Sequence, residues 1–195
     1  ALMFQQLPTA GLPFDFETWE DFEHYAADMI KTGVIDSFDE IRWDIRPSPK
    51  FGTLELRICD GLPSIREVAA IAALSQCLVE HYSREIDAGR PTPRMPAWFA
   101  QENKWRAARY GMDAILILDE AGNEDLVTTD LQRLLVMLEP VAQDLGCAEE
   151  LSWINDIVAD GASYQRQRKV AHAAGGALDA VVGSLVEEMR AGRPL

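Results

Sequence analysis

Basic residues are scarce in this chain of 195 residues, which has 18 lysines and arginines against 32 aspartates and glutamates. The formal net charge of −14 argues against nucleic acid and anionic membranes as partners, because an acidic surface does not attract either. No apolar run approaches the roughly 18 residues that a membrane span needs, and we expect no signal peptide. We therefore expect neither nucleic acid nor a membrane as a partner.

Cysteine is also scarce. The three cysteines, Cys59, Cys77 and Cys147, are odd in number and far apart in the sequence, which favours reduced thiols in a cytoplasm. With 48% hydrophobic and 26% charged residues, the chain has the composition of a globular protein and is long enough to bury a sizeable core.

The most informative stretch runs from Ile41 to Asp60. Its alternation at period two predicts two strands whose apolar side chains share one face: Ile41, Trp43, Ile45, Leu54, Leu56 and Ile58. The segment between the strands, residues 47–52, holds two prolines and a glycine, which favour a turn. The stretch therefore predicts a β-hairpin with one apolar and one charged face.

The charged face places Glu55 and Arg57 side by side, about 7 Å apart at ~3.3 Å per residue. A carboxylate suits a hard cation and a guanidinium suits phosphate, which together are the groups that phosphoryl transfer needs. The alternative is a set of cross-strand ion pairs on a solvated face, each contributing ~0.2–1 kcal/mol. From the alternation alone, ion pairs are the more common outcome.

Residues 43–60, WDIRPSPKFGTLELRICD, resemble the W-D-x-R-P-x-P-x-x-G-T-x-E-x-R-x-x-D signature of the bacterial glutamate–cysteine ligase type 2 family, the YbdK-like carboxylate–amine ligases. Residues 4–13, FQQLPTAGLP, and residues 102–111, ENKWRAARYG, are similar to further blocks of that family. Three separated blocks in the right order make the resemblance specific.

The resemblance implies an α+β fold, part of a glutamine synthetase-like catalytic domain, with a small antiparallel sheet and a largely helical C-terminal half. In such a fold the sheet forms a funnel where ATP, Mg²⁺ and an amino acid meet. Glu55 would bind the metal, and Arg57 would stabilise the transferred phosphoryl group. Arg46 would face the same funnel and hold phosphate or a substrate carboxylate.

Lys50, Asn103 and Arg106 are the remaining candidates for contact with the nucleotide. The last two lie in a helix expected over residues 97–110, where a spacing of three places them near each other. The competing interpretation of this helix has Trp105 and Ala108 packed inside and two basic residues outside, namely Lys104 and Arg109.

The activity implied is ATP-dependent ligation of an amino acid carboxylate to an amine through an acyl phosphate, with glutamate and cysteine as the expected pair. Partners would be small-molecule amino acids and ATP, and a homo-oligomer is left open. Two alternatives remain: a non-catalytic binding or assembly domain that kept the fold, and a phosphotransferase of guanidino or amino substrates.

One departure from the family concerns the start of the chain. The family begins with a strand of the type G-x-E-x-E that supplies metal ligands, and no such stretch precedes Gln5. We therefore expect residues 1–195 to be the C-terminal portion of one catalytic domain, with 1–111 as its sheet-forming part and 112–195 mainly helical. The N-terminal half of the same enzyme would be a required partner, and the fragment alone would be inactive.

Capping and periodicity predict the other elements. Helices are expected at 18–32, at 65–86 with burial all round, from Thr129 through Pro140, and at 149–160, 163–173 and 177–189; a strand is expected within 112–119. Arg166, Arg168 and Lys169 form the most basic patch, which could guide ATP, although charge on a helix surface is the commoner outcome.

Overall fold

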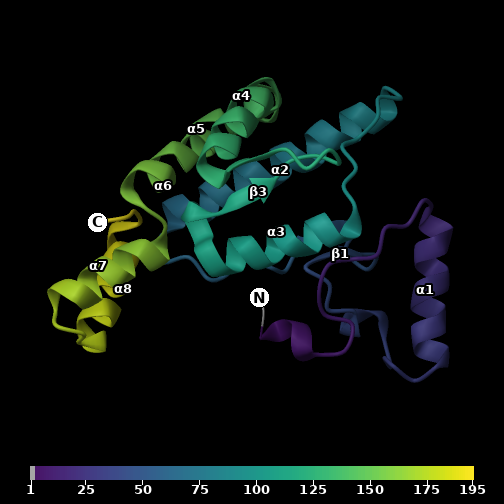
Figure 1. Cartoon of the computed structure of the whole chain (residues 1–195), viewed down its shortest axis with the longest axis horizontal. Coiled ribbons are helices and arrows are strands. Elements are labelled where there is room, and N and C mark those ends of the chain that lie inside the picture. Colours follow the sequence, from purple (N-terminus) through teal and green to yellow (C-terminus); the bar gives the residue numbers. More distant parts are fainter. Residues whose placement is uncertain (1–2) are drawn as a thin grey trace. The chain divides into compact units, whose positions relative to one another are not determined.

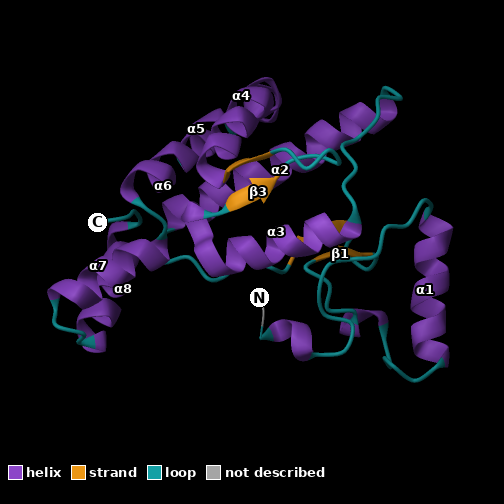
Figure 2. Ribbon diagram, viewed as in Figure 1, coloured by secondary structure: helices purple, strands orange, loops and turns teal. Residues whose placement is uncertain are grey.

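The computed structural model describes residues 3–195 and divides into two compact units, one ending at Asp60 and the other spanning Gly61–Leu195. Helices dominate, and the strands form two small antiparallel sheets of two strands each (Figures 1 and 2). The predicted α+β class and largely helical C-terminal half are thus confirmed. Within residues 3–195, no helix combines the length and apolar character needed to cross a membrane.

The first unit contains one α-helix and one hairpin. Its elements are η1 (Phe4–Gln6), α1 (Trp19–Lys31), η2 (Phe38–Glu40), β1 (Ile45–Ser48) and β2 (Thr53–Leu56). The capping box predicted for α1 is present: the Thr18 hydroxyl oxygen accepts from the Asp21 amide at 3.1 Å, and the Asp21 carboxylate accepts from the Thr18 amide at 3.0 Å.

An aromatic core supports the segment that leads into the hairpin. Trp43 is 3% exposed, and its ring centre lies 4.9 Å from that of Tyr25 and 5.9 Å from that of Phe22 on α1. Ile41 is fully buried in the same cluster. Because Ile41 and Trp43 pack into this core, the backbone that leads into β1 is held in place.

The hairpin differs from the prediction in extent and burial. Ile41 and Trp43 precede β1 and pack into the aromatic core, so they do not share a strand face with Ile45. The apolar face of the strands is exposed, with Ile45, Leu54 and Leu56 at 41%, 45% and 40%. Pro47 lies within β1, which a two-stranded sheet tolerates because each strand has a free edge that needs no donor.

The second unit holds the remaining elements. They are α2 (Ile65–Asp87), α3 (Ala97–Tyr110), η3 (Gly111–Asp113), β3 (Ile115–Ile117), β4 (Glu124–Leu126), α4 (Val127–Leu145), α5 (Ala148–Ser152), α6 (Ile154–Asp160), α7 (Ser163–Ala173) and α8 (Leu178–Ala191). The predicted strand is found as β3, whereas its partner β4 was not predicted. The helix expected over 149–160 is divided in two at Trp153.

The core of this unit lies between α2, α4 and α5. It is built from small or branched side chains: Ala73, Cys77, Leu138, Val141, Ala142 and Leu151. The prediction that α2 is buried all round is wrong, because Ile65 and Ile86 are 70% and 64% exposed. The buried stripe of this helix faces α4 and α5.

A buried charge cluster joins α2, α7 and α8. Arg166 Nη2 lies 3.0 Å from both carboxylate oxygens of Glu67, and its Nε lies 2.9 Å from Glu188 Oε1. All three residues are less than 10% exposed. The idea that Arg166 belongs to a basic surface patch is therefore wrong: its guanidinium is used inside the fold, where two acidic partners compensate its burial.

Gly111 ends α3 with φ of 57° and ψ of −125°, a backbone conformation that L side chains rarely adopt. A Cβ here would also lie 2.6 Å from Cζ of Tyr164. We expect Gly111→Ala to lower the free energy of unfolding by about 1–3 kcal/mol from backbone strain, with the steric overlap adding to this. Urea denaturation measures the loss.

Gly183→Ala is the matched control, because this glycine lies inside α8 with room for a methyl group. Apart from the backbone of its own helix, no atom of residues 3–195 lies within 4 Å of the place that the added carbon would take. The substitution should leave stability unchanged or raise it by about 0.5–1 kcal/mol. Equal losses in the two variants would contradict the strain assigned to Gly111.

Candidate active site on the β1–β2 hairpin

Arg46 and Glu55 face each other across the hairpin. The antiparallel register pairs Arg46 with Glu55, so both side chains lie on one face of the sheet. Arg46 Nη2 donates to Glu55 Oε2 at 2.6 Å. A hydrogen bond between two charged groups at this distance fixes the position of the carboxylate.

Arg57 completes the cluster. Its Nη1 lies 3.6 Å from the same oxygen, Glu55 Oε2, and its backbone amide donates to the Asp44 carbonyl at 2.7 Å. The side chains of Glu55 and Arg57 are 31% and 33% exposed, so both remain accessible from solvent. The structure thus brings together Arg46, Glu55 and Arg57, as the alternation predicted.

Arg46 is the buried member of the cluster, at 5% exposure. Its Nη1 donates to the carbonyls of Asp39 and Ile41 at 2.6 and 2.9 Å, while its Nε is buried without a hydrogen-bond partner within residues 3–195. The sequence did not reveal this arrangement, because the turn η2 that presents the Asp39 carbonyl was not predicted. Two backbone carbonyls thus hold the Arg46 guanidinium, which in turn holds the Glu55 carboxylate in place.

Charge keeps the Glu55 carboxyl ionised. The hydrogen bond from Arg46 is the largest effect lowering the pKa of Glu55, and the Arg57 charge acts in the same direction. A carboxylate with this environment is available as an oxygen ligand or charged acceptor at neutral pH.

A pH-dependent contribution to stability follows. Because the folded-state pKa of Glu55 lies below its ordinary value of 4.5, the ion pair stabilises the fold above about pH 4.5 and is lost as pH falls through the lowered pKa. We expect Glu55→Gln to lower the thermal midpoint at pH 7 and to have a smaller effect at pH 3. Glu120→Gln, in the exposed turn after β3, should show no such change, and a pH-independent effect of Glu55→Gln would contradict the ion pair.

The side chains of the hairpin cluster could supply only part of a metal site. Among residues 3–195, no three histidine, cysteine, aspartate or glutamate side chains gather in a way that could hold an ion. Glu55 can supply one carboxylate, and Mg²⁺ in phosphoryl-transfer sites is commonly bound by one or two carboxylates together with substrate phosphates and water. The hairpin therefore fits Mg²⁺ as the source of a single ligand.

Lys50 lies at the turn of the hairpin, where it is exposed and its ammonium sits 5.3 Å from the centre of the Phe51 ring. In this position its charge can meet an anion that approaches the turn. Its predicted contact with nucleotide stays a prediction.

Asn103 and Arg106 lie on α3 in the second unit, where both contact β3. The Asn103 side chain donates to the Ile117 carbonyl at 2.7 Å and accepts from the Ile117 amide at 2.8 Å. Arg106 donates to the Ile115 carbonyl at 3.1 Å. These bonds tie α3 to the edge of the sheet, and the predicted nucleotide role of both residues stays a prediction.

The competing interpretation of this helix is wrong for Lys104 and Trp105. Lys104 is buried at 8% exposure and Trp105 is 45% exposed, the reverse of the expected packing. The helix therefore presents Trp105, and not Lys104, to solvent.

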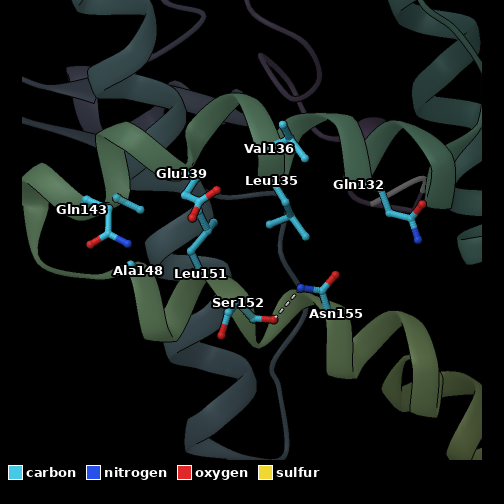
Figure 3. A pocket seen from close by; sticks show the side chains of 10 residues that line it. Gln132, Leu135, Val136, Glu139, Gln143, Ala148, Leu151, Ser152 and Asn155 are labelled. Atoms are coloured by element: carbon cyan, nitrogen blue, oxygen red, sulfur yellow. Dashed lines mark hydrogen bonds between the residues drawn. The ribbon is translucent and has the colours of Figure 1, made fainter.

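A hollow of about 460 Å³ lies between α4 and the α5–α6 segment, and none of the residues that line it is a predicted site residue (Figure 3). Leu135 and Val136 face it from α4, and Ser152 and Asn155 face it from the opposite side. Its one charged lining residue is Glu139, so the described residues around it offer no positive group to a phosphate.

Comparisons with known proteins extend these observations. The family model described as glutamate-cysteine ligase family 2 matches residues 1–184. The chain is 62% identical to "Putative glutamate--cysteine ligase 2-2" of Paenarthrobacter aurescens and 61% identical to "Putative glutamate--cysteine ligase 2-1" of an Arthrobacter species. It is 59% identical to "Putative glutamate--cysteine ligase 2" of Mycobacterium tuberculosis.

The three alignments cover 97–98% of this chain but 50% of each relative. The chain thus spans about half the length of the curated relatives it matches. The family match extends over almost all of it, including the hairpin with Arg46, Glu55 and Arg57. This chain therefore belongs to glutamate–cysteine ligase family 2.

Proposed function

We propose that a family-length protein containing this chain joins an amino acid carboxylate, with glutamate as the expected substrate, to an amine, with cysteine as the expected acceptor, at the expense of ATP. The observation that carries the proposal is the cluster of Arg46, Glu55 and Arg57 on one hairpin face in a member of a ligase family. Two guanidiniums around one ionised carboxylate suit a site where charged phosphoryl oxygens and a cation meet.

The chemistry divides into two steps. A substrate carboxylate oxygen attacks the γ-phosphorus of ATP, and the bond from that phosphorus to ADP breaks, which leaves an acyl phosphate. The amine nitrogen then attacks the acyl carbon, the bond to phosphate breaks, and the nitrogen loses a proton. Mg²⁺, when bound, supplies positive charge to the phosphate oxygens.

The residues of the hairpin divide this work. We assign contact with the transferred phosphoryl group to Arg57, which is a third exposed, and Glu55 would supply one ligand oxygen to Mg²⁺. Arg46 is buried and bonded to Glu55, so we assign it to positioning that carboxylate in place of direct contact with phosphate. Lys50 would meet the nucleotide at the turn.

A second candidate function is a binding or assembly domain without activity. The 2.6 Å contact between Arg46 and Glu55 favours it, because a carboxylate already paired in this way needs no ligand. An ADP-release assay of the family-length protein with a panel of carboxylates and amines separates the candidates. Release that requires both a carboxylate and an amine supports the ligase. Release with an amino or guanidino substrate alone, which keeps the transferred phosphate, supports a phosphotransferase, and no release with any pair supports the non-catalytic domain.

The 195-residue chain alone should fold but release little or no ADP in the same assay, because its described part supplies one metal-ligating carboxylate on the hairpin. Circular dichroism checks the folding of the chain. Full ATP-dependent ligation by the chain alone would contradict the expectation that a further segment completes the site.

A further inference from the structure

A groove of about 480 Å³ crosses the second unit where α3 meets η3, β3 and β4. Apart from Ile115, its lining is aromatic and charged: Glu102, Trp105, Arg106, Tyr110, Asp113 and Glu124. None of these residues takes part in the hairpin cluster. The role proposed for the hairpin therefore does not account for this groove.

Two aromatic side chains form one wall. Trp105 and Tyr110 are 45% and 47% exposed, and their ring centres lie 5.8 Å apart at an interplanar angle of 82°. Large aromatic side chains that stay this exposed inside a groove offer both apolar area and ring faces of negative potential. Ring faces of this kind attract cations.

The charged side chains of the groove are negative in sum, so they attract cations as the ring faces do. Arg106 lies between two carboxylates, with Nε 3.0 Å from Glu102 and Nη1 2.5 Å from Glu124. Asp113 is a third carboxylate, without a hydrogen bond or ion pair to any residue of the described part of the chain.

Three carboxylates against the single guanidinium of Arg106 leave a net charge of −2. The guanidinium of Arg109 lies 5.3 Å from the Tyr110 ring centre, and counting it still leaves −1. A phosphate would meet net repulsion here, whereas a cation would be attracted both by Asp113 and by the rings.

We propose that this groove binds a small organic cation that carries a primary ammonium group on an alkyl chain. The ammonium would pair with Asp113 and lie near the face of Trp105, and the alkyl chain would lie along the two rings. This proposal does not rest on the proposed ligase function, because the groove and its charges belong entirely to the second unit.

The test uses the 195-residue chain, labelled with ¹⁵N, and n-butylammonium as the probe, with n-butanol and butyrate as neutral and anionic probes of similar size. Trp105→Phe identifies the indole N–H signal of Trp105 among the five tryptophans of the chain. We expect a saturable shift of that signal with n-butylammonium and none with the other two probes.

Asp113→Asn should weaken n-butylammonium binding about 5-fold, the effect of removing one partly solvated charge contact of roughly 1 kcal/mol. Glu139→Gln removes the same charge from the hollow of Figure 3 and should leave binding unchanged. Equal weakening in both variants would overturn the assignment to Asp113, because only the overall charge would then matter.

Two further results would overturn the proposal. One is the absence of a saturable shift with n-butylammonium, or an equal shift with n-butanol. The other is a shift of the Trp105 signal with ATP that Arg106→Gln abolishes, which would support the predicted nucleotide role of Arg106 instead.

Discussion

Arg57→Ala in the family-length protein is expected to lower the rate of ADP release by about 10²–10³-fold, the usual cost of removing one fixed donor to a developing charge. The reason is geometric: Arg57 is held beside Glu55, and its backbone amide bonds to Asp44, so the guanidinium is in place before substrate arrives. Glu55→Gln should lower the rate to a similar extent and raise the Mg²⁺ concentration needed for half-maximal activity.

Arg133→Ala is the matched control, because this arginine is 53% exposed on α4 and pairs with surface carboxylates. It should keep full activity. Unchanged turnover in Arg57→Ala and Glu55→Gln, with folding confirmed by circular dichroism, would remove the hairpin from the proposed site.

Arg166→Met is expected to have the largest effect on stability, lowering the free energy of unfolding by about 3–5 kcal/mol. The substitution leaves the carboxylates of Glu67 and Glu188 buried, at 2% and 4% exposure, without their cation. Domains of ordinary stability have about 5–15 kcal/mol in total, so the variant should unfold at a much lower urea concentration.

Two variants separate this cause from the loss of side-chain packing. Lys169→Met changes an exposed cation on the same helix and should leave the free energy of unfolding within about 0.5 kcal/mol of the original. Adding Glu67→Gln and Glu188→Leu to Arg166→Met should recover much of the loss, because this cluster then holds no unpaired charge. A triple variant as unstable as Arg166→Met would show that packing dominates.

Local signals in the sequence predicted the main features of the β1–β2 hairpin. Strand alternation places Arg46 and Glu55 on one face in any antiparallel register that pairs them, and Arg57 follows at the same parity. The Thr18 capping box likewise fixes the start of α1 through contacts three residues apart. Features that depend on neighbours in the sequence could therefore be predicted.

Features that depend on distant segments could not. Arg166 meets Glu67 across 99 residues, and nothing in the basic run around Arg166 distinguishes the buried arginine from its exposed neighbours. β4 has the sequence Glu-Asp-Leu, which lacks strand propensity and pairs because β3 and the turn at Gly122 bring it there. Arg46 is buried because carbonyls of an unpredicted turn accept its donors.

The central claim is that the hairpin cluster activates a carboxylate by phosphorylation, and hydroxylamine tests it most directly. Supplied in place of the amine, hydroxylamine converts an acyl phosphate into a stable hydroxamate and phosphate. We predict that the family-length protein forms one hydroxamate per ADP from glutamate and ATP, and that Glu55→Gln and Arg57→Ala lower both products together. Ligation without hydroxamate formation, or hydroxamate formation that survives both substitutions, would contradict the role assigned to this hairpin.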